Sequence, residues 1–458
     1  MTTPTRDIDE SAPRITSKNQ LIERLVGGAK PRAEWRIGTE HEKFGFIADG
    51  LRPLPYEGSA SIKALLEGLA SRFDWTPIHE GPNIIGLKKN SASISLEPGG
   101  QFELSGAPLD NLHETCKEIT DHLKETRELT KPMGVDFLGL GFSPIWSFDQ
   151  TPAMPKGRYG IMKAYMEKVG RLGRQMMYRS CTVQTNLDFG SEADMVKKLR
   201  VSLALQPIAT ALFANSPFAE GRTNGFLSYR SHVWTDTDPD RTGMLPFAFD
   251  EGFGFEQYVD YALDVPMYFA RREGKYLDAS GLSFRDFMAG NLSILPGELP
   301  AMDDFDDHLS TIFPEVRLKT FLEMRGADAG QQESLCALSA FWVGLLYDEV
   351  SLDGAWELVK GWTAVERQSL RSAVPVLGLK APIRNTNAQS LAREALRLSA
   401  EGLRRRNRLN ASDKDETIFL APLQQIADSG VTRAEHWLAR YNGPWKRDLR
   451  HAFAEALI

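Results

Sequence analysis

The sequence predicts an α+β protein in which an antiparallel sheet is flanked by helices. Short apolar strands and helical patterns alternate irregularly, without the regular strand–helix–strand order that is typical of a doubly wound parallel sheet. From residue 333 onwards, apolar residues recur with helical spacing and strand signals are few. No Pro/Gly/Ser-rich linker separates this part from the rest. We therefore expect residues 17–458 to form one catalytic domain, of which 333–458 is mainly helical.

The period of the apolar residues predicts each element. Residues 1–16 are polar and have no such period, which indicates a flexible N-terminal arm. Helical spacing predicts helices over 17–28, 60–72, 109–133 and 191–213. The predicted strands are Trp35–Phe46, Ile84–Leu87, Ser93–Leu96, Gln101–Leu104, Asp136–Phe142, Ser180–Phe189 and Glu315–Met324. Residues 214–256 are rich in Gly, Asn, Ser, Thr and Asp with little periodicity, so we expect loops that contribute to an active site.

Composition narrows the classes of partner and location. A net charge of −7 gives no reason to expect nucleic acid. The one basic run, Arg404–Arg408, is interpreted as a solvated helix face. The sequence has no stretch of about 18 uninterrupted apolar residues, so we expect no membrane span. Three cysteines without CxxC spacing do not indicate a disulfide scaffold, and the acidic first residues do not resemble a secretory signal. These features predict a cytoplasmic protein.

Glutamates in predicted strands carry the strongest chemical signal. Glu40 and Glu42 are two residues apart, so in an extended segment both carboxylates lie on one sheet face, while His41 points to the other. Glu is depleted in strands and like charges on one face repel. A bound divalent cation would offset that cost.

Two further segments repeat the pattern. Around the turn Pro98-Gly99-Gly100, apolar residues are even-numbered on both sides, as in a hairpin with an odd-numbered loop, so Glu97 and Glu103 share the opposite face. Glu323 and Arg325 also share a strand face. Oxygen ligands without clustered Cys or His favour Mg²⁺ or Mn²⁺. The alternative is that these glutamates lie on the solvated faces of antiparallel strands.

Arginines near irregular segments are candidates for binding an anionic substrate. Arg158 follows a Pro/Gly-rich loop, and Arg230 lies four residues before Trp234, which could form the wall of a small pocket. Arginine binds carboxylates and phosphates in bidentate fashion, although ordinary surface ion pairs would also account for these residues. The sequence contains no Walker A motif, so a nucleotide would not be held by a P-loop.

Six segments of the chain resemble the plant-type glutamate–cysteine ligases, a family also found in proteobacteria. They are IGTEHEKFGF (Ile37–Phe46), SLEPGGQFELSG (Ser95–Gly106), MPKGRY (Met154–Tyr159), LQPIATALFANSP (Leu205–Pro217), FLSYRSHVWTDTD (Phe226–Asp238) and the stretch Glu315–Asp328. The similarity runs from about residue 20 to the C-terminus, and we expect a proteobacterial member.

The resemblance implies a glutamine-synthetase-like curved antiparallel sheet forming a cup. It implies an enzyme that phosphorylates the glutamate γ-carboxylate with ATP and transfers the γ-glutamyl group to the cysteine amine, the first step of glutathione biosynthesis. By motif position, Arg325 would face the transferring phosphoryl group, and Glu42 is a candidate catalytic residue. The implied Mg²⁺ ligands are Glu40, Glu42, Glu97, Glu103 and Glu323. The implied glutamate pocket consists of Arg158, Arg230, Thr182, Trp234 and Tyr268.

The resemblance also concerns the cysteines. Plant members have two regulatory disulfides per chain. Cys116 and Cys336 match one pair, whereas Ala279 and Ile294 occupy the places of the other, which excludes control through that second pair. A disulfide and two buried reduced cysteines both remain open for Cys116 and Cys336. Monomer and homodimer are also open, with the homodimer favoured.

Three other functions compete with this interpretation. A guanidino-kinase-like phosphotransferase would need a reactive cysteine beside a guanidinium site, and no such context is found. A non-catalytic glutamate or nucleotide sensor would be favoured by loss of a metal glutamate, yet all five positions keep Glu. A γ-glutamyl ligase that uses another amine is the hardest to exclude, because the sequence identifies no cysteine-binding residue.

Overall fold

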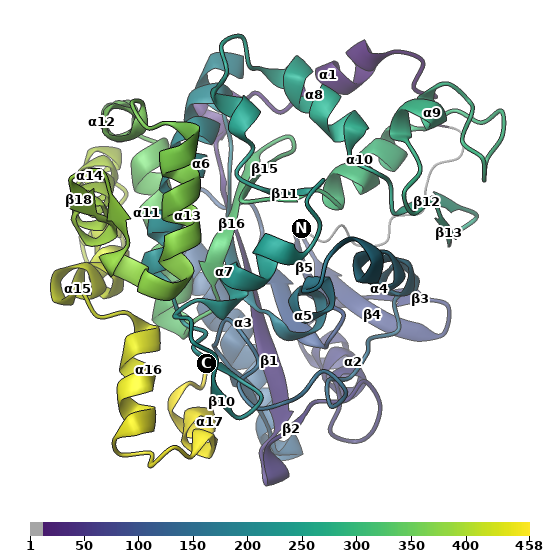
Figure 1. The fold of residues 1–458 in the computed structure, drawn as a ribbon. Coiled ribbons are helices and arrows are strands. Elements are labelled where there is room, and N and C mark those ends of the chain that lie inside the picture. The colour runs from purple at the N-terminus through teal and green to yellow at the C-terminus, as the bar shows by residue number, and fades with distance from the viewer. Residues whose placement is uncertain (1–11) are drawn as a thin grey trace.

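The computed structural model describes residues 12–458. Within that range, ten strands form one antiparallel sheet (Figure 1). Its main path runs through β15 (Val316–Leu318), β16 (Leu322–Asp328), β8 (Thr182–Leu187), β1 (Ile37–Ile47), β6 (Gln101–Ser105), β5 (Ala92–Leu96), β4 (Asn83–Lys89) and β3 (Thr76–Glu80). The short strands β2 (Arg52–Pro53) and β7 (Val135–Leu138) pair with one end of β1. The predicted antiparallel sheet is confirmed.

Helices surround this sheet, and those of the C-terminal third gather on one side of it (Figure 1). In the first part of the chain they are α1 (Lys18–Val26), α2 (Ile62–Arg72), α3 (Leu112–Met133), α4 (Gly157–Val169), α5 (Gly173–Arg179), α6 (Glu192–Leu212), α7 (Tyr229–Val233), α8 (Phe255–Asp264), α9 (Phe284–Met288) and α10 (Met302–Ser310). The C-terminal helices are α11 (Gln332–Leu346), α12 (Glu349–Val359), α13 (Ala364–Leu377), α14 (Ala388–Arg406), α15 (Ala421–Ser429), α16 (Arg433–Asn442) and α17 (Ala452–Glu455).

Short strand pairs complete the fold outside the main sheet. They are β9 (Phe218–Ala219) with β10 (Arg222–Thr223), β11 (Thr242–Gly243) with β14 (Phe313–Pro314), β12 (Phe269–Arg272) with β13 (Lys275–Asp278), and β17 (Pro382–Ile383) with β18 (Thr386–Asn387). The pair β11–β14 is parallel and lies beside the hairpin β15–β16. It thereby connects the irregular region after residue 213 to the edge of the sheet.

The hairpin β15–β16 differs from the single strand expected over residues 315–324. Leu318 pairs with Leu322 across a three-residue turn. A turn with an odd number of residues keeps the even-numbered apolar residues on one face, and an unbroken strand would show the same alternation. The sequence pattern therefore could not distinguish the two.

Part of the predicted N-terminal arm is anchored to the fold. Residues 1–11 lie outside the described residues. Ile15 is buried, and its N–H donates to the Pro300 carbonyl at 2.7 Å. Arg14 forms a β-bridge with Ala301. The chain is thus held in place three residues before helix α1 begins.

The buried helices explain why the C-terminal third packs firmly. Helix α6 is buried along nearly its whole length and contacts β16, α12, α13 and α14. Helix α11 is apolar on every face and contacts α3, β8 and α14. In the described part of the chain, no single helix is long and apolar enough to span a membrane. There, only α11 and α12 taken together, with a sharp bend between them, reach such a length and composition.

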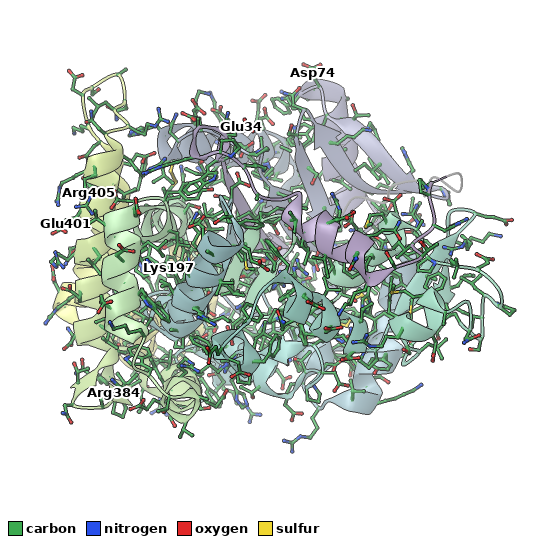
Figure 2. The ribbon with its side chains drawn as sticks, turned by 90° about the horizontal axis from the view of Figure 1, so that it is seen from above. Glu34, Asp74, Lys197, Arg384, Glu401 and Arg405 are labelled. Atoms are coloured by element: carbon green, nitrogen blue, oxygen red, sulfur yellow. A yellow bond between two sulfur atoms is a disulfide. The ribbon has the colours of Figure 1, made fainter. Side chains whose placement is uncertain are left out.

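The arginine run at the end of α14 forms mainly surface ion pairs, as expected. Arg405 is 38% exposed and lies 2.8 Å from Asp348. Figure 2 shows Glu401 and Arg405 at the outer edge of the molecule. Arg406 is the exception, because it pairs with the buried Glu416 at 3.2 Å. This run therefore has a structural role.

Candidate active site

A pocket of about 710 Å³ lies over one face of the central sheet. Strands β1, β6, β8 and β16 form its floor, and α4, α7 and the segment before β15 contribute to its walls. The pocket brings together most of the residues singled out from the sequence. These are Glu40, Glu42, Glu97, Glu103, Arg158, Thr182, Arg230, Trp234 and Arg325.

Strand register sets the position of the carboxylates. Glu42 on β1 pairs directly with Glu103 on β6. Leu96 pairs with Phe102 in the hairpin β5–β6, which leaves Glu97 at the turn on the face of Glu103. Burial and then the charges of Glu97 and Glu103 raise the pKa of Glu42 well above its usual value. Burial and then the charge of Glu103 raise the pKa of Glu97 to about 8.

Neutral donors hold the other two carboxylates of this face in place. Ser95 and Ser105 donate to Glu103 at 2.8 and 3.0 Å. The Asn186 side chain donates to Glu40 at 2.7 Å. Both glutamates are almost completely buried. Neutral hydrogen bonds orient these carboxylates without adding positive charge.

Glu323 has a different environment from the other four. It is fully buried and absent from the pocket lining. Arg317, its partner across the hairpin, donates to both of its oxygens at 2.8 and 2.9 Å. Burial raises its pKa, but Arg317, Lys319 and Arg325 outweigh this effect and hold the pKa well below its usual value. Three cations therefore already compensate this carboxylate.

The carboxylates of the pocket form a candidate cation site. Among residues 12–458, no group of three or more His, Cys, Asp or Glu side chains is arranged closely enough to hold a metal ion as it stands. However, burial and then the charges of neighbouring glutamates raise the pKa values of Glu42 and Glu97. A set of closely spaced carboxylate oxygens suits a hard divalent cation. The chemistry of these residues thus fits Mg²⁺.

Two buried arginines line the pocket as well. Arg158 lies in the first turn of α4, a helix not predicted from the sequence, and Arg230 lies in α7. Both are less than 10% exposed. Among residues 12–458, the Nε atoms of Arg158 and Arg230 and the indole nitrogen of Trp234 have no hydrogen-bond partner. Buried donors left in this way are ready to bind an anionic ligand.

Thr182 and Arg325 connect the strands of the pocket floor. The Thr182 N–H donates to Glu42 at 2.9 Å, and the Thr182 hydroxyl donates to the Ala327 carbonyl. Arg325 donates to Gln184 at 2.8 Å and also pairs with Glu323. Strand β16 therefore positions a guanidinium group beside the carboxylates of β1.

Tyr268 is absent from the pocket lining. It is buried, and the Arg241 guanidinium stacks on its ring at 3.8 Å, while Asp238 lies 3.5 Å from its hydroxyl. Several lining residues were missed in the sequence, among them Gln184, Arg317 and Gln101. The signal that could have revealed Arg317 was its place opposite Glu323, which the prediction of a single strand over residues 315–324 concealed.

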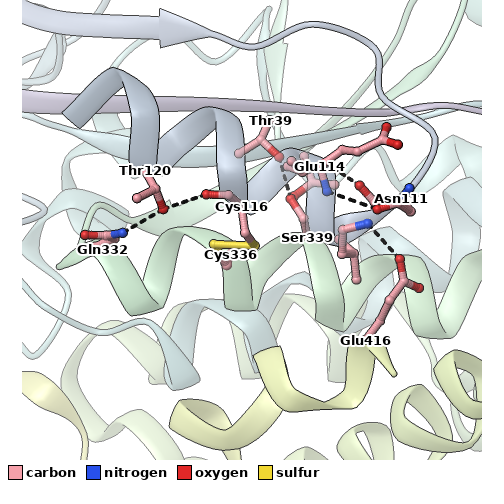
Figure 3. Close-up of a disulfide and its surroundings, with 12 residues drawn as sticks. Thr39, Asn111, Glu114, Cys116, Thr120, Gln332, Cys336, Ser339 and Glu416 are labelled. Carbon is pink, nitrogen blue, oxygen red and sulfur yellow. Dashed lines mark hydrogen bonds between the residues drawn. A yellow bond between two sulfur atoms is a disulfide. The ribbon is translucent and has the colours of Figure 1, made fainter. Parts of the chain in front are cut away.

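A disulfide joins Cys116 on α3 to Cys336 on α11 (Figure 3). The two Cα atoms are 5.6 Å apart although 220 residues separate them in sequence. Close to it, Thr39 of β1 and Ser339 of α11 share a hydrogen bond of 2.7 Å. Of the alternatives left open by the sequence, the structure thus has the disulfide, and the third cysteine, Cys181, is buried and free.

The fold and pocket together define a class of enzyme. An antiparallel sheet presents carboxylates to a pocket, and buried arginines with unpaired donors line the same pocket. Such a site can bind anionic substrates and a hard cation together, as phosphoryl transfer requires. The chain matches the glutamate–cysteine ligase family 2 over residues 36–455, and it belongs to that family.

Comparison with individual proteins agrees with this assignment. The chain is 57% identical over 454 residues to the chloroplastic glutamate–cysteine ligase of Medicago truncatula, covering 99% of this chain and 87% of that protein. It is 56% identical to the chloroplastic glutamate–cysteine ligase B of Oryza sativa subsp. japonica, covering 99% and 90%. A solved structure of the Francisella tularensis glutamate–cysteine ligase in complex with AMP is similar with a TM-score of 0.55 at 13% identity, covering 92% and 88%. That similarity supports the glutamine-synthetase-like α+β fold.

The relatives correct one expectation from the sequence. The predicted cytoplasmic location is wrong by this comparison, because these plant relatives are named chloroplastic. The prediction rested on the acidic first residues and the small number of cysteines. Neither property distinguishes one compartment from another for a folded catalytic chain.

Proposed function

We propose that this chain is an ATP-dependent glutamate–cysteine ligase that catalyses the first step of glutathione biosynthesis. The γ-carboxylate of glutamate attacks the γ-phosphorus of ATP, which releases ADP and forms γ-glutamyl phosphate. The cysteine amine then attacks the acyl carbon, phosphate leaves and the amine loses a proton. Family membership over residues 36–455 is the observation that carries this function.

Buried arginines account for binding of the anionic substrates. We assign Arg158 and Arg230, together with Thr182 and Trp234, to the glutamate pocket, since the unpaired donors of the two arginines and the indole lie in one wall. Arginine can donate two parallel hydrogen bonds to a carboxylate. Arg325 faces the transferring phosphoryl group in this proposal, because β16 holds it beside Glu40 and Glu42. Tyr268 acts indirectly, through its packing against Arg241.

Mg²⁺ is proposed as the cation of this site. The residues that would hold it are Glu40, Glu42, Glu97 and Glu103. Glu323 forms an ion pair with Arg325. When bound, Mg²⁺ would neutralise charge on the phosphates. The raised pKa values of Glu42 and Glu97, caused by burial and then by neighbouring glutamates, support this part of the proposal, since a cation favours the ionised carboxylates. Glu42, at the centre of the cluster, is the proposed catalytic carboxylate.

We propose that residues 17–458 act as a single catalytic domain. The main hydrophobic cluster draws residues from Ile15 to Ala427, and a second one packs beside β4–β6; both border the same sheet, which supports a single domain. That the protein forms a homodimer, and that it comes from a proteobacterium, remain predictions.

The reaction is tested by measuring ADP release from purified protein with ATP, Mg²⁺ and glutamate. Cysteine is compared with water, alanine and 2-aminobutyrate as acceptors. We expect strong stimulation by cysteine, and γ-glutamylcysteine as the product by mass spectrometry. Preference for another amine would keep the ligase chemistry and change the acceptor. ATP binding without turnover on any amine would instead favour a glutamate or nucleotide sensor.

A further inference from the structure

A second, smaller pocket adjoins the candidate active site. Its empty space, open solvent included, is about 310 Å³, and it lies between α7, the pair β11–β14, β16 and α13. Four residues line both pockets: Arg230, Trp234, Phe313 and Arg325. The two spaces are therefore neighbours whose walls have these four residues in common.

Arg371 distinguishes this smaller pocket. It comes from α13, far along the chain, and is only 6% exposed. Its Nε donates to Glu315 at 2.8 Å, and one terminal nitrogen donates to the Ser231 carbonyl at 3.0 Å. Among residues 12–458, its other terminal nitrogen, Nη1, has no hydrogen-bond partner. A buried guanidinium N–H without an acceptor is costly, so the site is built to receive one.

The charges around Arg371 indicate what would bind there. Arg230, Arg325 and Arg371 line the pocket together with a single carboxylate, Glu315. A free α-amino acid carries a carboxylate and an ammonium group, which match this combination of guanidinium groups and one carboxylate. Glu315 can accept a hydrogen bond from an ammonium group, whereas a polyphosphate has only acceptors to offer it. A nucleotide also needs more room than the smaller pocket offers.

We propose that this adjoining pocket is the subsite for the acceptor amino acid and that Arg371 binds its α-carboxylate. Glu315 holds Arg371 in position and faces the ammonium group of the acceptor. The shared wall then places the amine beside the glutamyl group in the larger pocket. This inference rests on the proposed function, because the acceptor is the second substrate of that reaction.

The test compares cysteine with cysteamine, which has the same thiol and amine but no carboxylate. For the wild type and Arg371→Gln, kcat/KM is measured for both acceptors at saturating ATP and glutamate. In the variant we expect kcat/KM for cysteine to fall by roughly 30-fold or more, because a buried charge pair with substrate is lost. We expect kcat/KM for cysteamine, and the KM values for glutamate and ATP, to change little.

Arg367→Gln is the matched control. Arg367 lies one turn earlier on α13, is 7% exposed and packs on Phe249 at 3.4 Å, outside both pockets. This variant should keep the wild-type preference for cysteine over cysteamine. If Arg371→Gln does not fold, Arg371→Lys keeps the charge but loses the fork geometry, and the same loss for cysteine is expected.

Several results would overturn the subsite. One is that kcat/KM falls equally for both acceptors in Arg371→Gln. Another is that this variant shows a higher KM for ATP and no change with cysteine. A third is that the wild type uses cysteamine as well as cysteine. A wild type that forms no γ-glutamylcysteine would contradict the proposed function itself. The two failures are therefore distinguishable.

Discussion

At the scale of single residues, the site is defined by buried carboxylates that lie close together. Glu42 and Glu103 face each other across β1 and β6, and Glu97 lies nearby. By contrast, Glu323 is fully compensated by Arg317 and its neighbours. Burying closely spaced carboxylates costs folding free energy, which is typical of groups that serve ligand binding.

Replacing Glu42 by Gln should separate function from stability. We expect kcat to fall by roughly 100-fold, because a charged group of the phosphoryl-transfer site is lost. The melting temperature should stay the same or rise, since repulsion from Glu97 and Glu103 is removed. Steady-state kinetics and thermal denaturation check the two effects.

Glu118→Gln is the control for this variant. Glu118 is a partly buried carboxylate whose pKa is raised by burial, but it lies outside the pocket and accepts the Ala107 N–H at 2.9 Å. Its kcat should match the wild type. Near-normal turnover in Glu42→Gln would contradict the role of Glu42.

His308 should make stability depend on pH. Burial lowers its pKa from 6.5 to about 4, and its Nε2–H donates to the Ala262 carbonyl at 2.8 Å. Because the folded pKa is the lower one, protons bind the unfolded chain first. The free energy of unfolding should therefore fall by up to about 3 kcal/mol as the pH drops from 6.5 to 4.

Urea denaturation at several pH values checks this dependence. His308→Gln, whose amide can still donate to Ala262, should show a smaller loss of stability than the wild type over that range. Identical slopes for the two proteins would exclude His308 as the cause.

At the scale of elements, the β5–β6 turn fixes the position of Glu97. Gly100 has a φ of +83°, and a Cβ on Gly99 would collide with the Tyr178 carbonyl oxygen. The Gln101 side chain ties the turn to α5, because it accepts the Gly99 N–H and donates to the Met177 carbonyl. The turn and α5 are therefore held together beside the pocket.

Gly99→Ala should damage both the turn and the site. Either the turn or α5 must shift to accept the methyl group, so we expect a loss of about 1–3 kcal/mol in stability and reduced kcat. Chemical denaturation and steady-state kinetics measure the two effects.

Gly134→Ala is the backbone control for this element. Gly134 ends α3 with a φ of +66°, and a Cβ added there would meet no other heavy atom within 4 Å. The variant should lose about 1 kcal/mol of stability and keep its kcat. A Gly99→Ala protein that behaved in the same way would contradict the role of the turn.

The elements also show where sequence reasoning succeeds. The alternation around Pro98-Gly99-Gly100 predicted correctly that β5 and β6 pair residues of equal parity, because an odd-numbered loop preserves parity. The same property concealed the turn between β15 and β16. Helix α4 was missed because it follows a Pro/Gly-rich stretch and its apolar residues do not form one face.

At the scale of the whole molecule, the disulfide joins two distant parts of the core. Helices α3 and α11 lie on the same side of the sheet, and Cys116 and Cys336 close a loop of 220 residues (Figure 3). A cross-link over so long a loop restricts the unfolded chain strongly. Stability should therefore depend on the redox state.

Reduction should lower the stability of the wild type by about 2–5 kcal/mol. Cys116→Ser should begin at the lower value and respond little to reductant. Cys181→Ser alters the buried free cysteine, so it should keep the response to reductant. Denaturation with and without dithiothreitol checks these outcomes, and a wild type insensitive to reductant would contradict a stabilising disulfide.

The sequence by itself determined the antiparallel sheet, the shared face of Glu40 and Glu42, and the family resemblance. These depend on alternation and motifs within short segments, which local backbone geometry converts directly into a face or a turn. Only the tertiary structure decided that Glu323 is paired with Arg317, and that Arg371 reaches Glu315 across 56 residues. Such contacts depend on which distant elements pack together, and packing is driven by apolar burial that no local pattern specifies.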